Sequence, residues 1–420
     1  MTDGRILDLC CMSVEDTKYL NRLYSKYKKY YVEMIDSIGR RQSNIYWWIT
    51  PLANKNWYLS ESLKSICIAI LGIERIQKYH NIEEVYCPSI EVAETIEKYC
   101  NKAKRQVRCK AKNDNKNITI KKQILCFEQC VRKELDTYKR VVRAINEYGI
   151  TDLKNKKIIL IDTYIKASEV DKDGYEEKYF KNISDYTDEK IFFLPQIVLN
   201  TREPINVLIK KILKSKSYKY IFKEQFLEKS DYYKLFLYPL FCVIFCLRKK
   251  YIRGIDVTAI INKDLVRGIT SGNSMEGMLK YFSIKGMKRQ GINIDRLIGW
   301  YEGQASSNGL FLAYRRMYLK GKSIGYIGGA IDSNNINLAP SREQIRHKAI
   351  PQEITVIAEC FKHIPKQFVS DVKVTVVPAF RLQKEYQYAD DKKINKKRIL
   401  VALSYDKITS TELLKWVKNL

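Results

Sequence analysis

Histidine is scarce in this chain, and its scarcity limits the metal chemistry open to the protein. Only three histidines occur in 420 residues, and none stands in an HExxH or similar spacing. The 11 cysteines include the i,i+4 pairs Cys126/Cys130 and Cys242/Cys246. Neither pair has two further ligands nearby, although a structural zinc site needs four. We therefore expect no metal ion, and reduced thiols that are mostly buried.

Long apolar runs are also lacking. The longest one, residues 235–247, contains Pro239 and is too short for a transmembrane helix. It predicts a buried helix. The alternative is an interfacial segment on an anionic membrane, because Arg248, Lys249, Lys250 and Arg253 follow at once. No stretch near the start resembles a secretory signal. We expect a cytoplasmic location, with peripheral contact at the inner face of the cytoplasmic membrane as the finer alternative.

Basic residues, by contrast, are in large excess. Lys+Arg is 75 against Asp+Glu 47, which gives a formal net charge of +28. Such a charge favours anionic partners, namely nucleic acid, anionic lipids, acidic glycans or nucleotide-linked substrates. A solvated, lysine-rich surface explains the excess equally well. The 30 tyrosines keep a basic nucleic-acid-binding protein open as an alternative function. No zinc-finger spacing and no RNP-like aromatic strand supports it, so nucleic acid is not the favoured partner.

Short β-branched runs with glycine or proline at their ends recur along the chain, as in strands of a buried parallel sheet. The expected strands are residues 44–49, 84–87, 106–109, 157–164, 191–194, 297–301, 324–331, 354–358 and 372–377. Strands alternate with helices, so the expected fold class is α/β with a doubly wound, mainly parallel, Rossmann-like sheet. Ser60 is expected to cap the helix that follows it, and Pro195 to stop the strand before it.

The expected organisation is a Rossmann-like domain over residues 1–385 with a helical insertion at about 203–290. A charged linker follows over residues 386–397. Residues 398–420 predict one strand and one helix, the first βα unit of a second α/β domain. One such unit cannot bury both faces of a sheet. The second domain therefore reads as incomplete.

Several local patterns, taken in order, resemble a family of bacterial surface-polysaccharide glycosyltransferases with the two-domain GT-B fold. Some relatives in that family transfer 3-deoxy-octulosonic (Kdo) or nonulosonic acids from CMP-linked donors. The strongest pattern is Trp300-Tyr301-Glu302-Gly303-Gln304, and the resemblance spans residues 46–403. The other segments are residues 47–49, 55–60, 159–164, 325–329, 340–343 and 378–381. Gly303 departs from the family pattern, because an asparagine is expected there.

The resemblance implies a glycosyltransferase of capsule or lipopolysaccharide O-antigen biosynthesis. Its donor would be a nucleotide sugar, CMP-linked in the ulosonic-acid case, and its acceptor a glycan or lipid-linked glycan, with no separate cofactor. In GT-B enzymes the carboxyl-terminal half supplies most of the donor site. The resemblance therefore implies an acceptor-side domain here. A non-catalytic, acceptor-binding partner subunit is the alternative.

Glycosyl transfer needs a carboxylate to deprotonate the acceptor hydroxyl or to act as a nucleophile, and donors for the leaving phosphate. Glu302 is the first candidate, because it follows an apolar strand beside a glycine. Asp256 and Asp295 are reserve carboxylates, and each fits a helix cap equally well. The expected substrate-binding residues are Gln304, Ser306, Asn308, Gly328, Gly329, Arg381, Asp162, Lys55 and Asn56. Arg381 suits bidentate binding of a phosphate or sugar carboxylate, or an interdomain salt bridge.

Overall fold

The computed structural model describes residues 5–56, 60–112, 119–149, 152–187, 189–382, 410, 411, 413 and 414. The chain divides into two units, Met1–Phe380 and Arg381–Leu420, and each is described by itself. The predicted linker and the predicted strand at 398–403 lie outside the described residues. Of the helix predicted at 409–417, the four described residues are helical.

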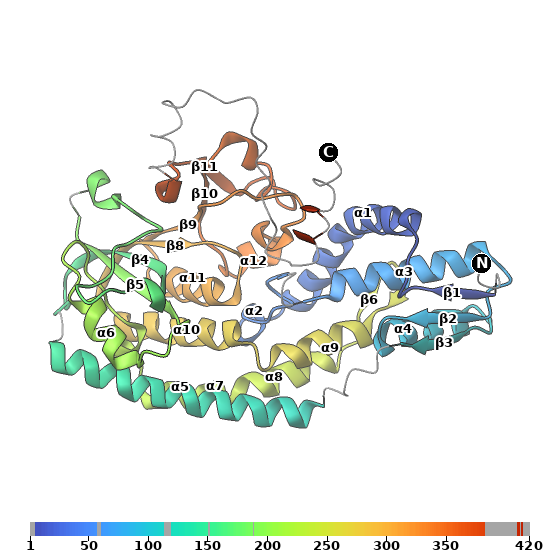
Figure 1. The fold of residues 1–420 in the computed structure, drawn as a ribbon, viewed down its shortest axis with the longest axis horizontal. Coiled ribbons are helices and arrows are strands. Elements are labelled where there is room, and N and C mark those ends of the chain that lie inside the picture. The colour runs from blue at the N-terminus through green and yellow to red at the C-terminus, as the bar shows by residue number, and fades with distance from the viewer. Residues whose placement is uncertain are drawn as a thin grey trace. The chain divides into compact units, whose positions relative to one another are not determined.

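A six-stranded parallel sheet is the centre of the first unit (Figure 1). Its strands are β4 (Lys157–Lys166), β5 (Ile191–Val198), β8 (Asn293–Trp300), β9 (Lys322–Ile327), β10 (Glu353–Val356) and β11 (Lys373–Val376). The spatial order is β11-β10-β9-β8-β4-β5, and every neighbouring pair is parallel. This confirms the predicted α/β class and its parallel sheet. The strand order reverses between β4 and β8, and in open α/β sheets ligands bind at the carboxyl edge of such a switch point.

Both faces of this sheet are buried, as the near-continuous apolar strands predict. On β4, Ile158 and Leu160 belong to the core that contains α10 (Gly272–Arg289) and α11 (Ala305–Met317). The alternate residues Ile159 and Ile161 belong to the core formed with α5 (Ile120–Tyr148) and α6 (Ile205–Leu213). Successive side chains of a strand point to opposite faces. Even-numbered residues of β4 therefore face α10 and α11.

Two predictions about strands are wrong, one about the type of element and one about where a strand ends. Residues 44–49 form not a strand but the helix α2 (Ile45–Trp48), whose first turn is capped where the Asn44 side chain accepts from Trp47 N at 3.3 Å. All four residues of α2 are buried, and a short apolar run buried on every side has no readable period. Pro195 does not stop β5, because β5 is an edge strand and an edge tolerates a residue without a backbone N–H.

A smaller parallel sheet, β1 (Ile6–Asp8), β2 (Glu84–Cys87) and β3 (Arg108–Ala111), lies in the N-terminal part of the same unit. The sequence predicted its second and third strands but missed β1. Helices and a hairpin complete the unit: α1 (Val14–Gly39), α3 (Ser62–Lys78), α4 (Ile90–Lys102), α7 (Lys229–Leu235), α8 (Leu237–Cys246), β6 (Tyr251–Ile252), β7 (Ile255–Asp256), α9 (Thr258–Gly268) and α12 (Arg342–Arg346). The described residues between 203 and 290 are thus largely helical.

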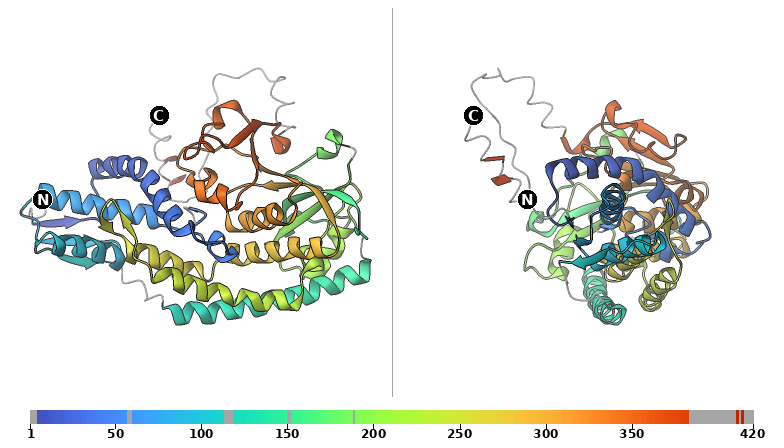
Figure 2. Two further views of the ribbon diagram at one scale, coloured as in Figure 1. Left: turned by 180° about the vertical axis from the view of Figure 1, so that it is seen from behind. Right: turned by 90° about the vertical axis from the view of Figure 1, so that its right-hand side faces the viewer.

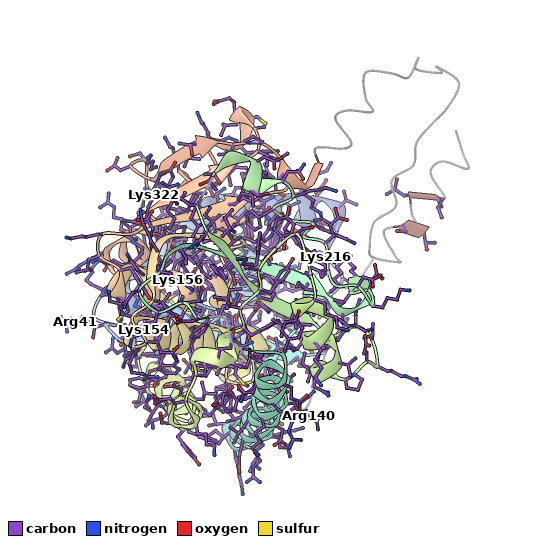
Figure 3. The ribbon with its side chains drawn as sticks, turned by 90° about the vertical axis from the view of Figure 1, so that its left-hand side faces the viewer. Arg41, Arg140, Lys154, Lys156, Lys216 and Lys322 are labelled. Carbon is purple, nitrogen blue, oxygen red and sulfur yellow. The ribbon has the colours of Figure 1, made fainter. Side chains whose placement is uncertain are left out.

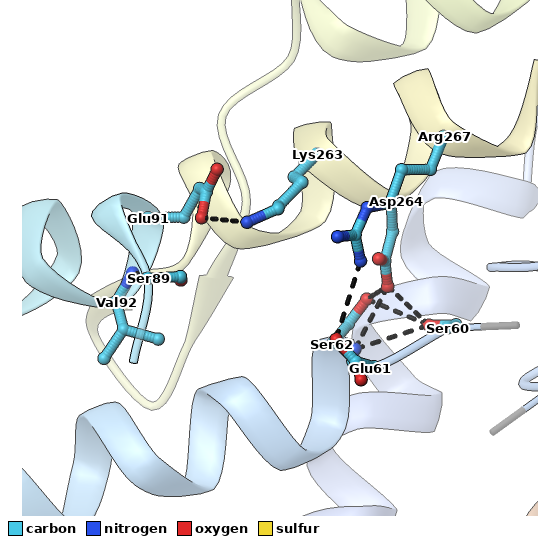
Figure 4. Close-up of polar contacts among 9 residues, drawn as sticks. All are labelled: Ser60, Glu61, Ser62, Ser89, Glu91, Val92, Lys263, Asp264 and Arg267. Carbon is cyan, nitrogen blue, oxygen red and sulfur yellow. Dashed lines mark hydrogen bonds and ion pairs between the residues drawn. The ribbon is translucent and has the colours of Figure 1, made fainter. Parts of the chain in front are cut away.

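A buried carboxylate joins α9 to the start of α3 (Figure 4). The Asp264 Oδ2 atom accepts from the Ser60 hydroxyl at 2.6 Å, from Ser62 N at 3.0 Å and from the Ser62 hydroxyl. Its negative charge sits at the positive end of the α3 dipole. The expectation that Ser60 caps this helix is therefore wrong. The N-cap residue Glu61 makes no side-chain cap bond, and Asp264 from a distant segment accepts from the first-turn amide.

The basic excess is spread over many elements on the side drawn in Figure 3. The labelled side chains come from the ends of α1 and α6, from α5, from the turn before β4 and from the start of β9: Arg41, Lys216, Arg140, Lys154, Lys156 and Lys322. They point outward in different directions around this face. On this side the positive charge does not converge on a single groove.

Candidate functional site

A cavity of about 370 Å³ opens at the carboxyl ends of β8 and β9. Its lining includes five residues that the sequence predicted as functional: Asn56, Glu302, Gln304, Gly328 and Gly329. The asparagines of the segment around the 3₁₀ helix η4 (Ile336–Leu338), Asn335 and Asn337, form another part of the wall. The lining thus combines one carboxylate with several side-chain amides, at the sheet edge where ligands of this architecture bind.

The Glu302 carboxylate is held on both oxygens. Trp300 Nε1 donates to Oε1 at 2.9 Å, and Gln304 Nε2 donates to Oε2 at 2.5 Å. Gln304 is oriented in turn, because its Oε1 accepts from Asn273 Nδ2 of α10 at 2.8 Å. A carboxylate oxygen has more than one acceptor site, so each can still accept a proton or hydrogen bond from a ligand. The arrangement fixes the direction in which Glu302 faces the cavity.

Gly303 shapes the turn that carries Glu302. Its φ of +60° is left-handed, and asparagine also tolerates that region. A Cβ atom at Gly303 would, however, overlap the carbonyl oxygen of Asn337. The Asn337 Nδ2 atom donates to the Glu302 carbonyl at 2.7 Å, which holds the two segments together. This close approach leaves no room for a side chain at position 303.

Tyr164, which the sequence reasoning missed, lies beside this site on β4. Burial raises the pKa of its phenol well above the ordinary value, and the charges of Glu302 and Asp162 raise it further. Tyr164 therefore keeps its proton and can act as a hydrogen-bond donor near Glu302. The alternation along β4 could have revealed it, because Tyr164 shares a face with Asp162, two residues earlier.

Asp162 is buried in an ion pair instead of facing the cavity. Its Oδ1 lies 2.5 Å from the Lys280 Nζ of α10, and each side chain is 2% exposed. Burial raises the Asp162 pKa, and the charge of Lys280 opposes that rise. The pair ties β4 to α10 next to the switch point. Asp162 therefore does not line the cavity, and its role is to hold β4 and α10 together beside it.

Four other candidates lie apart from the cavity lining. Asp295 is near the opposite end of β8 from Glu302, 3.2 Å from Lys157 Nζ. The Asp256 carboxylate accepts from Thr258 N at 2.9 Å, but the N-cap residue of α9 is Val257, so the alternative role of Asp256 as a helix cap is wrong. Ser306 and Asn308 are fully buried on α11, where Asn308 donates to Asn54. Neither Ser306 nor Asn308 is the N-cap residue of α11, which is Gln304.

Lys55 lines a neighbouring cavity of about 750 Å³, which shares Asn335 with the first. Its Nζ donates to Gln344 Oε1, and its backbone is left-handed with a φ of +56°. Burial lowers the pKa of Lys55 to about 8, against the opposing charge of Asp36. Arg381 is exposed on the 3₁₀ helix η6 (Phe380–Leu382) and begins the second unit.

The two glycines after β9 have different roles, and their alanine variants should separate them. A Cβ at Gly328 would overlap the Trp300 ring, whereas a Cβ at Gly329 meets no atom within 4 Å. We expect Gly328→Ala to lower the free energy of unfolding by about 1–3 kcal/mol through overpacking. Gly329→Ala should change it by less than about 0.5 kcal/mol. Urea unfolding of both variants measures this, and equal losses would contradict the assignment.

The loop between β4 and β5 packs against Trp300 of the cavity wall and is held by a buried glutamate. Tyr179 and Phe180 of this loop pack edge-on against Trp300, with ring centroids 4.8 and 6.3 Å away. The Glu177 Oε1 atom accepts from the Thr163 hydroxyl at 3.0 Å and from Tyr179 N at 2.8 Å. Glu177 is fully buried, and burial raises its pKa to about 7 from an ordinary 4.5.

This raised pKa makes stability depend on pH. Between pH 4.5 and about 7 the folded protein keeps a proton on Glu177 that the unfolded chain releases. Stability contributed by the protonated form is therefore lost as pH rises through this window, by up to about 3 kcal/mol. Glu177→Gln mimics the protonated form and should flatten the pH profile of unfolding between pH 4.5 and 7. Parallel profiles for the two proteins would show that Glu177 does not titrate in this way.

The comparisons with known proteins do not add to this geometry. No family model, no curated protein and no solved structure gave a significant match to the chain.

Proposed function

We propose that the protein is a GT-B-type glycosyltransferase of surface-polysaccharide biosynthesis, and that the cavity beside Glu302 binds its glycan acceptor. The observation that carries this proposal is the oriented carboxylate in an amide-lined cavity. Glu302 is fixed by Trp300 and Gln304, and Asn56 and Asn337 add further hydrogen-bonding groups. Amide side chains both donate and accept, which suits the many hydroxyls of a sugar.

In the proposed reaction the acceptor hydroxyl gives its proton to Glu302 as its oxygen attacks the anomeric carbon of the donor. A new glycosidic C–O bond forms, and the bond from the anomeric carbon to the phosphate oxygen breaks. The phosphate leaves with the nucleotide and the bonding electron pair. Direct displacement of this kind inverts the anomeric configuration. Formation of a covalent glycosyl-Glu302 intermediate would retain it.

The donor in this proposal is a nucleotide-activated sugar, with CMP-linked ulosonic acids as the first class to test. The acceptor is a growing capsule or O-antigen glycan, free or lipid-linked. The proposed place of reaction is the cytoplasmic side of the membrane. Among the described residues, no helix is both long and apolar enough to cross a bilayer.

A donor-hydrolysis and transfer assay tests the proposal. The full chain is incubated with CMP-ulosonate or other nucleotide sugars, with and without acceptor glycans, and nucleotide release is followed. We expect release that increases with acceptor. Asp295→Asn is the matched control, because it removes a carboxylate at the other end of β8 and should leave release unchanged. If none of the tested donors releases its nucleotide, even after a second polypeptide of the same pathway is added, the result would contradict the proposed transfer.

A further inference from the structure

A stripe of exposed apolar side chains runs along α7 and α8, and among the described residues only Phe236 of the stripe makes a ring contact, with Phe127 of α5. The apolar stripe consists of Tyr233, Phe236, Leu237, Leu240, Ile244 and Leu247. Three of these side chains are largely exposed: Leu247 by 79%, Tyr233 by 71% and Leu240 by 55%. Their spacing of three or four residues puts them on one face of a helix. A surface helix would normally present polar residues there.

The opposite face of α8 is well anchored, so the stripe is not exposed through loose packing. Tyr238, Cys242 and Phe245 are buried. The Phe245 ring packs edge-on against Trp47 of α2 at 5.1 Å between centroids, and Phe241 stacks on Tyr46 at 4.7 Å. Phe236 connects α7 and α8 with helical backbone angles, which keeps the stripe continuous. A continuous exposed surface of apolar side chains such as this one is typical of an interaction surface.

The positive charge around the stripe favours a partner with an anionic surface. Residues 232–255 contain five basic side chains and no acidic one. Arg248, Lys249 and Arg253 are exposed directly after the stripe. In Figures 1 and 2, α8 lies along an outer side of the first unit next to α5. On α5, Ile124 and Leu125 are exposed one turn before Phe127, which packs 6.3 Å from Phe236.

We propose that the α7–α8 stripe docks the protein on an anionic phospholipid surface, with its apolar side chains in the headgroup boundary and Arg248 and Lys249 on lipid phosphates. The ten residues of α8 span about 15 Å, far less than a bilayer core, so the helix lies on the membrane and does not cross it. A second copy of the chain fits less well, because pairing two such stripes would bring like charges together. This docking does not depend on the proposed transfer reaction.

Vesicle co-sedimentation of the full chain tests the proposal. The probe is a vesicle of phosphatidylcholine with about 30% phosphatidylglycerol, compared with a vesicle of phosphatidylcholine alone. We expect binding to the anionic vesicles that is lost at high salt. Arg248→Gln/Lys249→Gln should weaken it about 30-fold, since each basic residue near such a surface contributes roughly fivefold. Leu240→Gln/Ile244→Gln should weaken it about tenfold or more.

Matched control variants carry the same substitutions elsewhere on the surface. Lys154→Gln/Lys156→Gln removes two basic residues on the side shown in Figure 3, and Leu319→Gln removes a side chain that is 74% exposed. Both should bind as the unmodified chain does. Equal binding by all variants, or no preference for anionic vesicles, would overturn the proposal. A stable dimer that Leu240→Gln/Ile244→Gln dissociates would also overturn it, because the stripe would then be a protein interface.

Discussion

Replacing Glu302 with glutamine should lower kcat for sugar transfer by about 10³-fold and leave the fold intact. General-base catalysis typically contributes 10²- to 10⁴-fold, and an amide cannot take up the acceptor proton. Glutamine keeps the shape of the side chain and one acceptor oxygen, so Trp300 Nε1 can keep its bond. The acceptor KM should change little, because the variant removes a proton acceptor and not the amide wall. Steady-state kinetics over acceptor concentration measures both constants.

Gln304→Glu and Asn337→Ala help to interpret that result. Gln304→Glu would remove the amide that orients Glu302 and place a second negative charge against it, and should therefore lower kcat. Asn337→Ala removes a cavity amide and should raise KM more than it lowers kcat. If Glu302→Gln retains full kcat while folding normally, Glu302 has no catalytic role.

Lys280→Met should lower the free energy of unfolding by about 3–5 kcal/mol at pH 8. Asp162 and Lys280 are each 2% exposed and 2.5 Å apart, and removal of one partner leaves a buried charge without compensation. Burial already raises the Asp162 pKa, and Lys280 is its main opposing influence. In the variant the folded protein keeps Asp162 protonated, while the unfolded chain ionises above about pH 4. The loss should therefore be smaller at pH 5 than at pH 8.

The double variant Asp162→Asn/Lys280→Met serves as the control for this prediction. Both charges are gone, so the double variant should regain most of the stability and lose the pH dependence of the single variant. Chemical unfolding at pH 5 and pH 8 measures all three proteins. A single variant within about 1 kcal/mol of the unmodified protein at both pH values would contradict the role given to the pair.

The sequence predicted the sheet well because its strands are apolar, β-branched and bounded by turn residues. Residues 157–164, 297–301, 354–358 and 372–377 each overlap a strand of the six-stranded sheet, although their ends differ by up to four residues. Local patterns failed where distant contacts decide the structure. The run at 44–49 is helical and packs against α8, as the Trp47–Phe245 contact shows. Likewise, Asp264 accepts at the start of α3 from about 200 residues away, which no local signal contains.

The candidate site was predictable to the extent that strand ends converge on one edge of a parallel sheet. This logic predicted that Glu302 and Gln304 lie near Gly328 and Gly329, and all four residues line the same cavity. The same logic could not tell a residue that lines the cavity from one that is buried beside it. That difference depends on where along its strand each residue lies and on which face of the sheet its side chain points to. Asp162 points at Lys280 under the site, and Asp295 sits at the wrong end of its strand. Asn337 was missed because it reaches the site from η4, a short 3₁₀ helix in the segment between β9 and α12.

The most direct test is a crystal structure of the full chain with a bound fragment of an acceptor glycan. The account predicts sugar density in the cavity at the ends of β8 and β9, with a hydroxyl within hydrogen-bonding distance of Glu302 and a second one near Asn337. Density in the neighbouring cavity beside Lys55 alone, with Glu302 still bound only to Trp300 and Gln304, would contradict it.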